Sequence, residues 1–190
     1  MININKTHTS KSSIWSLFFI LILFIINGCC LKKGELVSTT RLSVEDRSLV
    51  PYQGNESISF QHSEGFQFEV ETLSKTNFYN NQEHCEDYVE YEVYNVNFFN
   101  DIPNLNVNIQ LSKFNSNEVA YFSLVSERTP FQEILPPPTA SIIIGEIVFN
   151  NVQTFQSLDT DYFISEILYN TTTGIIRINY KDETYVQIVP

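Results

Sequence analysis

The residues best suited to metal or nucleophilic chemistry lie in one short stretch, EHCED, at positions 83–87. His84 and Cys85 are residue types that bind Zn²⁺, and the flanking carboxylates offer oxygen ligands. A tetrahedral site needs ligands that converge from separated positions, whereas neighbouring side chains on a strand point to opposite faces. We therefore interpret this stretch as a solvated polar loop, and we predict no metal site and no other cofactor.

Nucleophilic catalysis would need a base, and beyond the N-terminal segment the chain offers His62 and His84. Neither lies near a Gly-x-Ser-x-Gly elbow or a cysteine-protease signature. The six glycines form no phosphate-binding loop. Carboxylates are plentiful, but in a chain with a net charge of −11 they are typical of a solvated surface. We expect no enzyme, and a hydrolase that uses some of these carboxylates and the two histidines is the weaker alternative.

The same negative charge argues against nucleic acid as a partner, because binding to nucleic acid needs a basic face. The most aromatic stretch is YVEYEVYNVNFF, at positions 88–99. Core and cross-strand packing explain such a stretch well. The alternative is an aromatic-lined pocket or a platform for stacking sugars, with Tyr88, Tyr91 and Tyr94 as the candidate binding surface.

The stretch FFILILFIINGCC, at positions 18–30, concerns the location of the protein. Its apolar run covers positions 14–26, whereas a helix that crosses a bilayer needs about 20 apolar residues. Lys6 and Lys11 precede the run. A basic start, a short apolar centre and a small residue at the end are typical of a cleaved secretory signal. An uncleaved signal anchor is the alternative.

The end of this run, Ile26-Asn27-Gly28-Cys29, resembles the lipobox of bacterial lipoprotein signal peptides. Ile26 stands where that pattern prefers Leu, and Asn27 where it prefers a small residue. The resemblance implies cleavage after Gly28, attachment of a diacylglyceryl group to the thiol of Cys29 and acylation of the new amino terminus. Two or three acyl chains hold a protein firmly on a membrane. Because Cys30 is not acidic, the rule for enteric bacteria implies transport to the outer membrane. No acidic run resembling a surface-export signal follows the cysteine, which favours an anchor that faces the periplasm.

We therefore expect three segments: a signal peptide over residues 1–28, a lipid anchor with a flexible tether over 29–47, and a single all-β domain over 48–190. Two cysteines besides Cys29 remain. Cys30 and Cys85 could pair in an oxidising envelope, and a free or buried Cys85 is the alternative.

Strict alternation predicts the strands. In NLNVNIQLSKF the apolar residues of positions 105–111 alternate with polar ones without a fault. Further strands are expected at 66–71, 119–126, 142–149, 152–155, 162–169, 175–180 and 185–189, with a loop at 75–88, a turn at 150–151 and a crossover at the prolines 136–138. The fold class is all-β with little helix. It is an antiparallel meander of about ten strands that forms a sandwich, a barrel-like sheet or a strongly curved sheet.

Two longer stretches, LVPYQGNESISFQHSEGFQFEVET and ILYNTTTGIIRINYKDETYVQIV, resemble the opening and closing segments of small uncharacterised lipoproteins of Bacteroidota-type bacteria. This resemblance implies a lipid-anchored envelope protein with an all-β fold. We expect its domain to bind an apolar small ligand or to dock an envelope protein. A purely structural or adhesive β-sandwich is the alternative.

Overall fold

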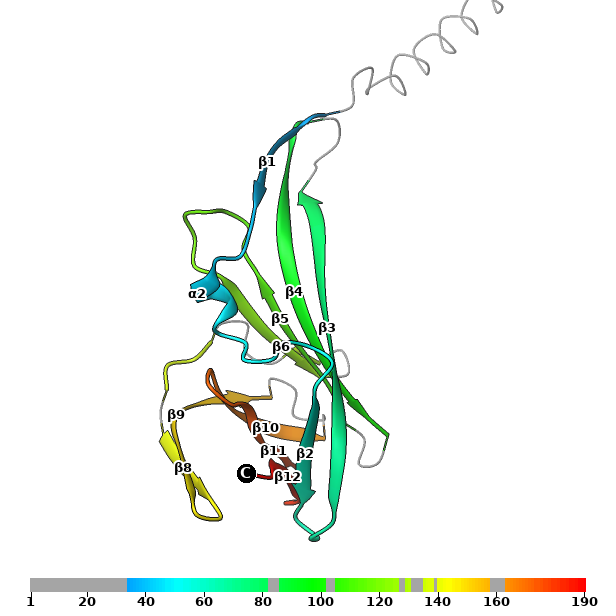
Figure 1. Ribbon diagram of the computed structural model, residues 1–190, viewed down its shortest axis with the longest axis vertical. Coiled ribbons are helices and arrows are strands. Elements are labelled where there is room, and N and C mark those ends of the chain that lie inside the picture. The colour runs from blue at the N-terminus through cyan, green and yellow to red at the C-terminus, as the bar shows by residue number, and fades with distance from the viewer. Residues whose placement is uncertain are drawn as a thin grey trace, which may run out of the picture. The chain divides into compact units, whose positions relative to one another are not determined.

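Strands make up most of the described residues in the computed structural model (Figure 1). The structure describes residues 34–81, 86–101, 105–126, 129–130, 135–138, 140–157 and 163–190. These residues belong to two compact units. In the smaller one, which contains residues 34–37 and 86–88 of the described chain, the amide of Glu35 donates to Asp87 Oδ1 at 2.9 Å and that of Tyr88 donates to the Glu35 carbonyl at 3.0 Å. The larger unit contains the remaining described residues.

Twelve strands and one short helix are present in the described part of the chain. The first half carries β1 (Leu36–Thr40), α2 (Val44–Arg47), β2 (Ser57–His62), β3 (Gln67–Asn81), β4 (Tyr88–Asn100) and β5 (Leu105–Ser112). The second half carries β6 (Tyr121–Ser126), β7 (Thr129–Pro130), β8 (Ala140–Ile144), β9 (Ile147–Gln156), β10 (Ile164–Asn170), β11 (Gly174–Tyr180) and β12 (Tyr185–Ile188). The prediction of an antiparallel all-β fold with little helix is confirmed.

Eleven strands follow one path of hydrogen-bonded neighbours, β7-β6-β5-β4-β3-β2-β12-β11-β10-β9-β8, and β1 pairs with β4 off this path. Within each half, strands that are neighbours in sequence are neighbours in the sheet, as a meander requires. The halves join where β2 pairs with β12. The sheet is not closed into a barrel, and β7 and β8 are its two ends. The prolines 136–138 lie in the connection between these ends, as predicted for a crossover.

Apolar side chains from both halves of the path meet in one core. The ring centroid of Phe122 in β6 lies 5.6 Å from that of Phe155 in β9 and 5.3 Å from that of Tyr169 in β10. Because β6 lies far from β9 and β10 along the path, the sheet must curve until these strands face each other. The largest fully buried side chains all belong to this core: Tyr169, Phe60, Phe98, Phe122, Phe155, Leu105, Ile109, Leu111, Leu124, Ile164 and Ile167.

The alternating stretch at 105–111 forms β5 as predicted. Its apolar residues are buried, and β5 lies between β4 and β6 in the sheet. Tyr94, Val96 and Phe98 of β4 are the cross-strand partners of Leu111, Ile109 and Val107, and all six side chains are buried. This face of β4 and β5 is the core face, and the opposite face carries the asparagines.

The prediction of a tether over residues 29–47 is wrong for its described part. Residues 36–40 form β1, and Leu42 is buried in the core. Helix α2 follows, with Ser43 as its N-cap. Apolar periodicity is absent here because the segment is held by polar contacts, which are described below.

The predicted loop over 75–88 is wrong from residue 75 to 81, which continue β3. The predicted strand over 142–149 and turn at 150–151 are also wrong. A turn at Gly145, with φ of +60°, divides the apolar run into β8 and β9, and Asn151 lies inside β9. Ile143 and Val148, which pair across this hairpin, are 66% and 52% exposed, so the run is not buried on both sides.

Tyrosine hydroxyls hold the segment between α2 and β2 against the sheet. The hydroxyl of Tyr169 donates to the Leu49 carbonyl at 2.7 Å, and that of Tyr94 donates to the Tyr52 carbonyl at 2.6 Å. The hydroxyl of Tyr52 in turn accepts the amide N–H of Ile175 at 2.6 Å. Burial raises the pKa of Tyr52 and that of Tyr169, so both phenols stay protonated. Residues 49–52 are therefore held to both halves of the sheet.

We predict that Gly174→Ala destabilises the protein more than Gly65→Ala. Both glycines have positive φ, +90° and +96°, so both variants lose the tolerance of glycine for that region. A Cβ at Gly174 would lie 1.8 Å from the Tyr52 hydroxyl oxygen, whereas nothing lies within 4 Å of a Cβ at Gly65. The free energy of unfolding, measured in urea, should fall by about 1–3 kcal/mol more for Gly174→Ala. Equal losses would show that Tyr52 does not constrain this turn.

Candidate functional site

The carboxylate of Glu92 is a charged group inside the larger unit. Its side chain is 4% exposed and lies on the core face of β4. The amide N–H of Leu42 donates to Oε2 at 3.0 Å, and the guanidinium of Arg47 binds Oε1. A buried carboxylate without such partners would cost several kcal/mol, so this contact fixes the segment from Leu42 to Arg47 on the sheet.

Helix α2 is placed by a second ion pair. The Ser43 hydroxyl accepts the amide N–H of Asp46 at 3.1 Å, and the amide of Ser43 donates to Asp46 Oδ2 at 2.9 Å, which forms a capping box. Lys113 Nζ donates to the same carboxylate oxygen at 3.0 Å. Partial burial acts to raise the pKa of Asp46, but the hydrogen bonds from Ser43 and Lys113 outweigh it and lower that pKa. The resulting stabilisation is present above the ordinary pKa of aspartate and is lost as the pH falls through the lowered value.

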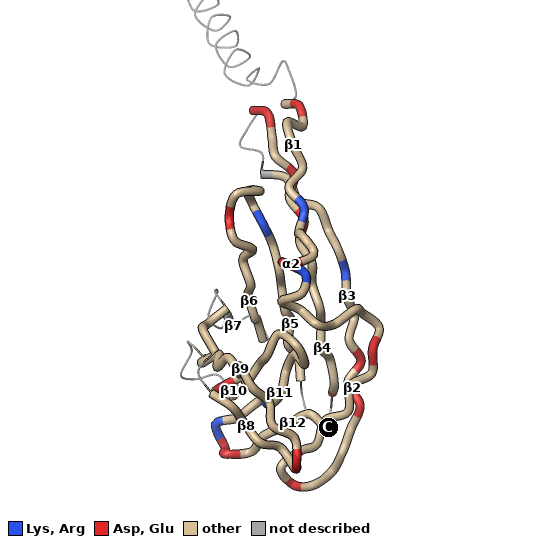
Figure 2. Tube along the Cα trace, turned by 60° about the vertical axis from the view of Figure 1, so that its left-hand side comes forward, with Lys and Arg blue, Asp and Glu red and all other residues tan. Residues whose placement is uncertain are grey.

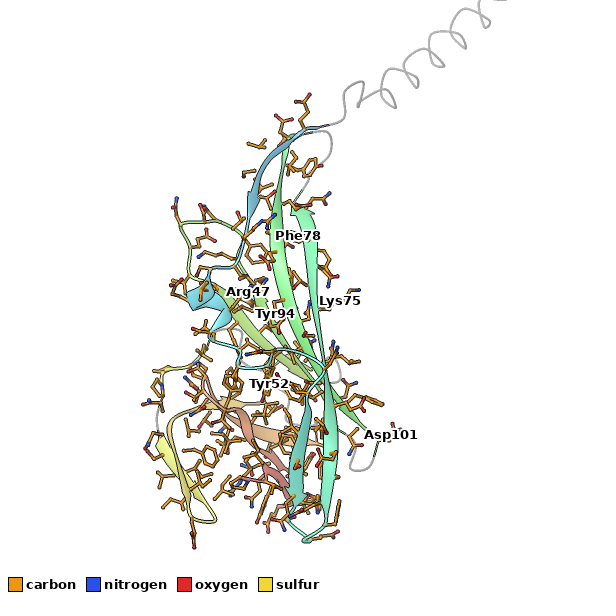
Figure 3. All side chains as sticks on the ribbon, viewed as in Figure 1. Arg47, Tyr52, Lys75, Phe78, Tyr94 and Asp101 are labelled. Carbon is orange, nitrogen blue, oxygen red and sulfur yellow. The ribbon has the colours of Figure 1, made fainter. Side chains whose placement is uncertain are left out.

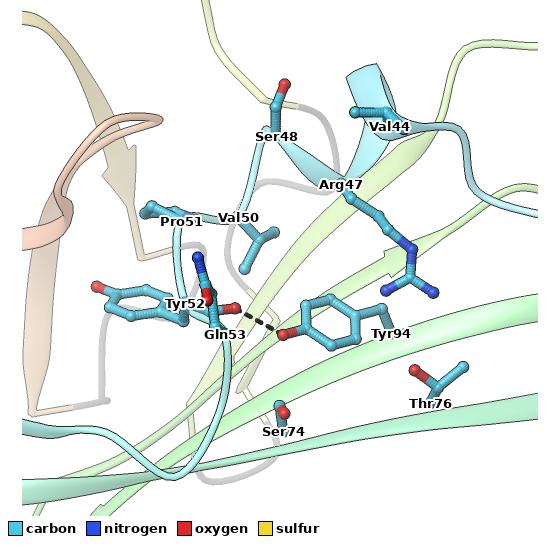
Figure 4. Close-up of a pocket in the computed structure, with 10 residues that line it drawn as sticks. All are labelled: Val44, Arg47, Ser48, Val50, Pro51, Tyr52, Gln53, Ser74, Thr76 and Tyr94. Carbon is cyan, nitrogen blue, oxygen red and sulfur yellow. Dashed lines mark hydrogen bonds between the residues drawn. The ribbon is translucent and has the colours of Figure 1, made fainter.

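A cleft of about 580 Å³ lies between this docked segment and the strands (Figure 4). Tyr94 lies at its base, and the Arg47 guanidinium carbon is 5.2 Å from the centroid of its ring. Ser74 and Thr76 of β3 contribute hydroxyls. The ten residues that line the cleft include no carboxylate, histidine or cysteine, so its hydroxyls have no neighbouring base there. The Arg47 side chain that lines the cleft is paired with Glu92.

The opposite face of the same strands carries a row of aromatic side chains. Tyr79 and Tyr91 are direct cross-strand partners in β3 and β4, and their ring centroids are 6.1 Å apart. The ring of Phe114, which follows β5, is 4.7 Å from that of Tyr91 and 6.4 Å from that of Tyr121 at the start of β6. Tyr79 and Phe114 are 48% and 49% exposed. We call Tyr79, Tyr91, Phe114 and Tyr121 the outer aromatic row.

Amide side chains adjoin this row on the same face. Asn95 and Gln110 are cross-strand partners, and so are Asn97 and Asn108, whose side chains form a hydrogen bond of 2.6 Å. We call these four residues the amide block. Lys75 of β3, the partner of Asn95, is the adjacent cation and projects away from Tyr94 (Figure 3).

The chain is strongly acidic, but the strands around the amide block and the outer aromatic row carry few charges on this face. Strand β5 carries no charged residue and is tan throughout in Figure 2. On β3, the outward carboxylates Glu69 and Glu71 lie toward the end that pairs with β2. From Leu73 to Tyr79, the outward residues of β3 and their described partners on β4 and β5 include no carboxylate.

The predicted aromatic surface of Tyr88, Tyr91 and Tyr94 is divided. Tyr91 and Tyr94 lie three residues apart on one strand, so their side chains are on opposite faces. Tyr94 is buried in the core, and Tyr91 belongs to the outer aromatic row. Tyr88 begins β4. The partners of Tyr91 could not be found from local sequence, because Tyr79 and Phe114 are adjacent to it only through strand pairing.

The other predicted site residues lie outside the described residues: Gly28, Cys29, Cys30 and Cys85. His84, for which no site was predicted, also lies outside them. Lipidation, signal cleavage and the Cys30–Cys85 disulfide therefore stay predictions. Within the described ranges, no group of three or more His, Cys, Asp or Glu side chains is arranged to hold a metal ion. No helix in the same ranges is long and apolar enough to span a bilayer.

Comparison of the chain with protein families, with curated proteins and with solved structures finds no match.

We predict that Arg47→Met lowers the free energy of unfolding by about 1–3 kcal/mol, because it leaves the buried Glu92 carboxylate with one fewer charged partner. Arg41→Met is the matched control. Arg41 lies 5.7 Å from the ring centroid of the half-exposed Phe78, a contact worth at most about 1 kcal/mol. Urea unfolding of both variants would measure the difference. If the two substitutions cost the same, Glu92 does not depend on Arg47.

Proposed function

We propose that this chain is a lipid-anchored protein of the bacterial cell envelope that binds a partner through the outer aromatic row and the amide block. In this proposal the signal peptide is cleaved after Gly28, and the lipid on Cys29 anchors the chain to the membrane. The expected location is the periplasmic side of the outer membrane. The β domain then works as a binding module held at the membrane, and no catalytic step is assigned to it.

The observation that carries this proposal is the exposure of the outer aromatic row. Aromatic residues that serve only to stabilise a sheet can do so on the core face, as Phe98 and Phe122 do. Tyr79 and Phe114 instead keep about half of their surface in solvent. Exposed aromatic clusters of this kind mark interaction surfaces.

An apolar ligand inside the sheet is supported less well. Rings from both halves already fill the described core, among them Phe60, Phe122, Phe155 and Tyr169. The cleft beside α2 is lined in part by Arg47, whose charge is taken up by Glu92. A surface partner is therefore favoured over a ligand enclosed by the strands.

A structural or adhesive role is the second candidate, and the β8–β9 hairpin favours it. β8 is an end strand of the sheet, and Ile143, Ile147 and Val148 of this hairpin are exposed. Exposed apolar residues on an edge strand are suited to pairing with a strand of another chain.

We predict that Cys29→Ala abolishes lipid labelling and leaves an unprocessed precursor, because the thiol that accepts the diacylglyceryl group is lost. Metabolic labelling with radioactive palmitate and the mobility of the chain on gels would measure both effects. Cys30→Ala is the matched control and should be labelled and processed normally. Normal processing of Cys29→Ala would exclude the lipoprotein anchor.

We also predict that a photoreactive phenylalanine at position 79 forms adducts in intact cells, whereas one at position 78 does not. Phe78 is the matched control because it is 44% exposed and points to the opposite face of the same strand. Illumination followed by gel analysis of the full chain would detect the adducts. Adducts from position 148 but not from 79 would support the structural candidate instead.

A further inference from the structure

We propose that the ligand of the outer aromatic row and the amide block is an uncharged polysaccharide chain. This inference rests on the proposed function, because it takes the same face as the binding surface and assigns the chemistry of its ligand. Three features of the face carry it: the succession of rings, the amides beside them and the absence of carboxylates among the outward strand residues from Leu73 to Tyr79 and their described partners.

The rings follow one another across neighbouring strands. Their centroid spacings of 6.1, 4.7 and 6.4 Å make a continuous series from Tyr79 to Tyr121. A pyranose ring presents an apolar C–H face that packs against an aromatic ring, and a polysaccharide repeats that face along its length. A row of rings therefore suits an extended chain of sugars, whereas a single small molecule would contact only one or two of them.

The amide block supplies the polar half of such a site. Each Asn or Gln side chain carries both hydrogen-bond donors and an acceptor, and a sugar hydroxyl also does both. The bond between Asn97 and Asn108 uses one donor and one acceptor and orients these two amides on the face. Asn95 and Gln110 lie one alternation nearer to the aromatic row and are half-buried.

The charges on and around the face indicate whether an extended ligand would be anionic, cationic or neutral. A polyanion would be repelled by a chain whose net charge is −11 and would meet Lys75 as the cation beside the amide block. A cationic partner would find no carboxylate among the outward strand residues between Leu73 and Tyr79 and their described partners. A neutral ligand chain rich in hydroxyl groups avoids both the repulsion of a polyanion and the missing carboxylate partners of a cation.

The test is calorimetric titration of the full chain, purified in a detergent without a sugar headgroup, with neutral linear hexasaccharides. The probes are cellohexaose, xylohexaose and the hexamer of N-acetylglucosamine. We expect at least one to bind, with an affinity that stays constant when the salt concentration is raised, because the hexasaccharides are uncharged and form no ion pair. Tyr79→Ala and Phe114→Ala should each weaken this binding about tenfold or more.

Phe99→Ala is the matched control. Phe99 is 57% exposed and lies on the same face of β4 as Tyr91, but it is separated from the outer aromatic row by Val93, Asn95 and Asn97. The affinity of the Phe99→Ala variant for the hexasaccharide should stay within about twofold of that of the parent chain. Circular dichroism of each variant would establish that all of them are folded, since both substituted row positions are half-exposed.

Several results would overturn the inference. These are the absence of binding by all three hexasaccharides, an equal loss in Phe99→Ala, or a dimer in sedimentation that Tyr79→Ala dissociates. Adducts to a protein from position 79, together with no hexasaccharide binding, would overturn the sugar ligand and leave the proposed function standing. If position 79 forms no adducts and no hexasaccharide binds, the proposed function is overturned as well.

Discussion

The buried carboxylate of Glu92 is the constraint on which the N-terminal part of the larger unit depends. A strand residue on the core face is normally apolar, and here a charged group occupies that place on β4. Its partners, the Leu42 amide and Arg47, both come from a segment that has almost no apolar periodicity of its own. The contacts of Glu92 therefore hold residues 42–47 on the sheet, as apolar burial holds the strands. The backbone of this segment, in place of large side chains, covers the core face around Glu92.

This arrangement makes the two faces of β3 and β4 unequal. On the core face, Thr76 and Tyr94 lie under the docked segment and line the cleft beside it. On the outer face, the aromatic row and the amide block are the surface itself. Hydrogen bonds of the Tyr52, Tyr94 and Tyr169 hydroxyls fix the chain between α2 and β2 to the sheet as well. The chain that covers the core face is therefore attached at several points. A partner can thus approach these strands from the outer side without displacing the segment.

Most of the strands could be predicted from alternation, because burial of one face leaves a period-two pattern that is local in sequence. Residues 105–111 are the clearest case. Prediction from alternation failed in two cases. In one, the core face carries charged residues, and in the other, an apolar run has one side exposed to solvent. In β4 the core face carries Glu90 and Glu92, so the polar pattern does not indicate which of the two opposite faces, that of Tyr91 or that of Tyr94, packs in the core. In the run at 142–149, every residue but two is apolar, and the turn at Gly145 is what divides it into a hairpin with an exposed side.

Only one residue of the outer aromatic row could be predicted from the sequence. Tyr91 belonged to an aromatic stretch and could be singled out. Tyr79 lay in a segment rich in asparagine that suggested a loop, and Phe114 follows a strand end. These residues meet only through the registers of β3 with β4 and β4 with β5, which depend on the whole sheet. The capping box of α2, Ser43 followed by Asp46, is a local sequence signal from which the start of this helix can be predicted.

The pairing of β2 with β12 has a consequence for how an exported chain acquires this fold. Tyr185 donates its amide N–H to the Ser63 hydroxyl across a sequence separation of 122 residues, and the two strands join the halves of the sheet. A chain that passes through a membrane from its N-terminus exposes β2 long before β12 arrives. Until then, one edge of β2 has no strand beside it, and such an edge invites pairing with other chains. If the chain is exported as proposed above, the sheet would be completed only after translocation, and until then the open edge of β2 would be open to binding by a chaperone.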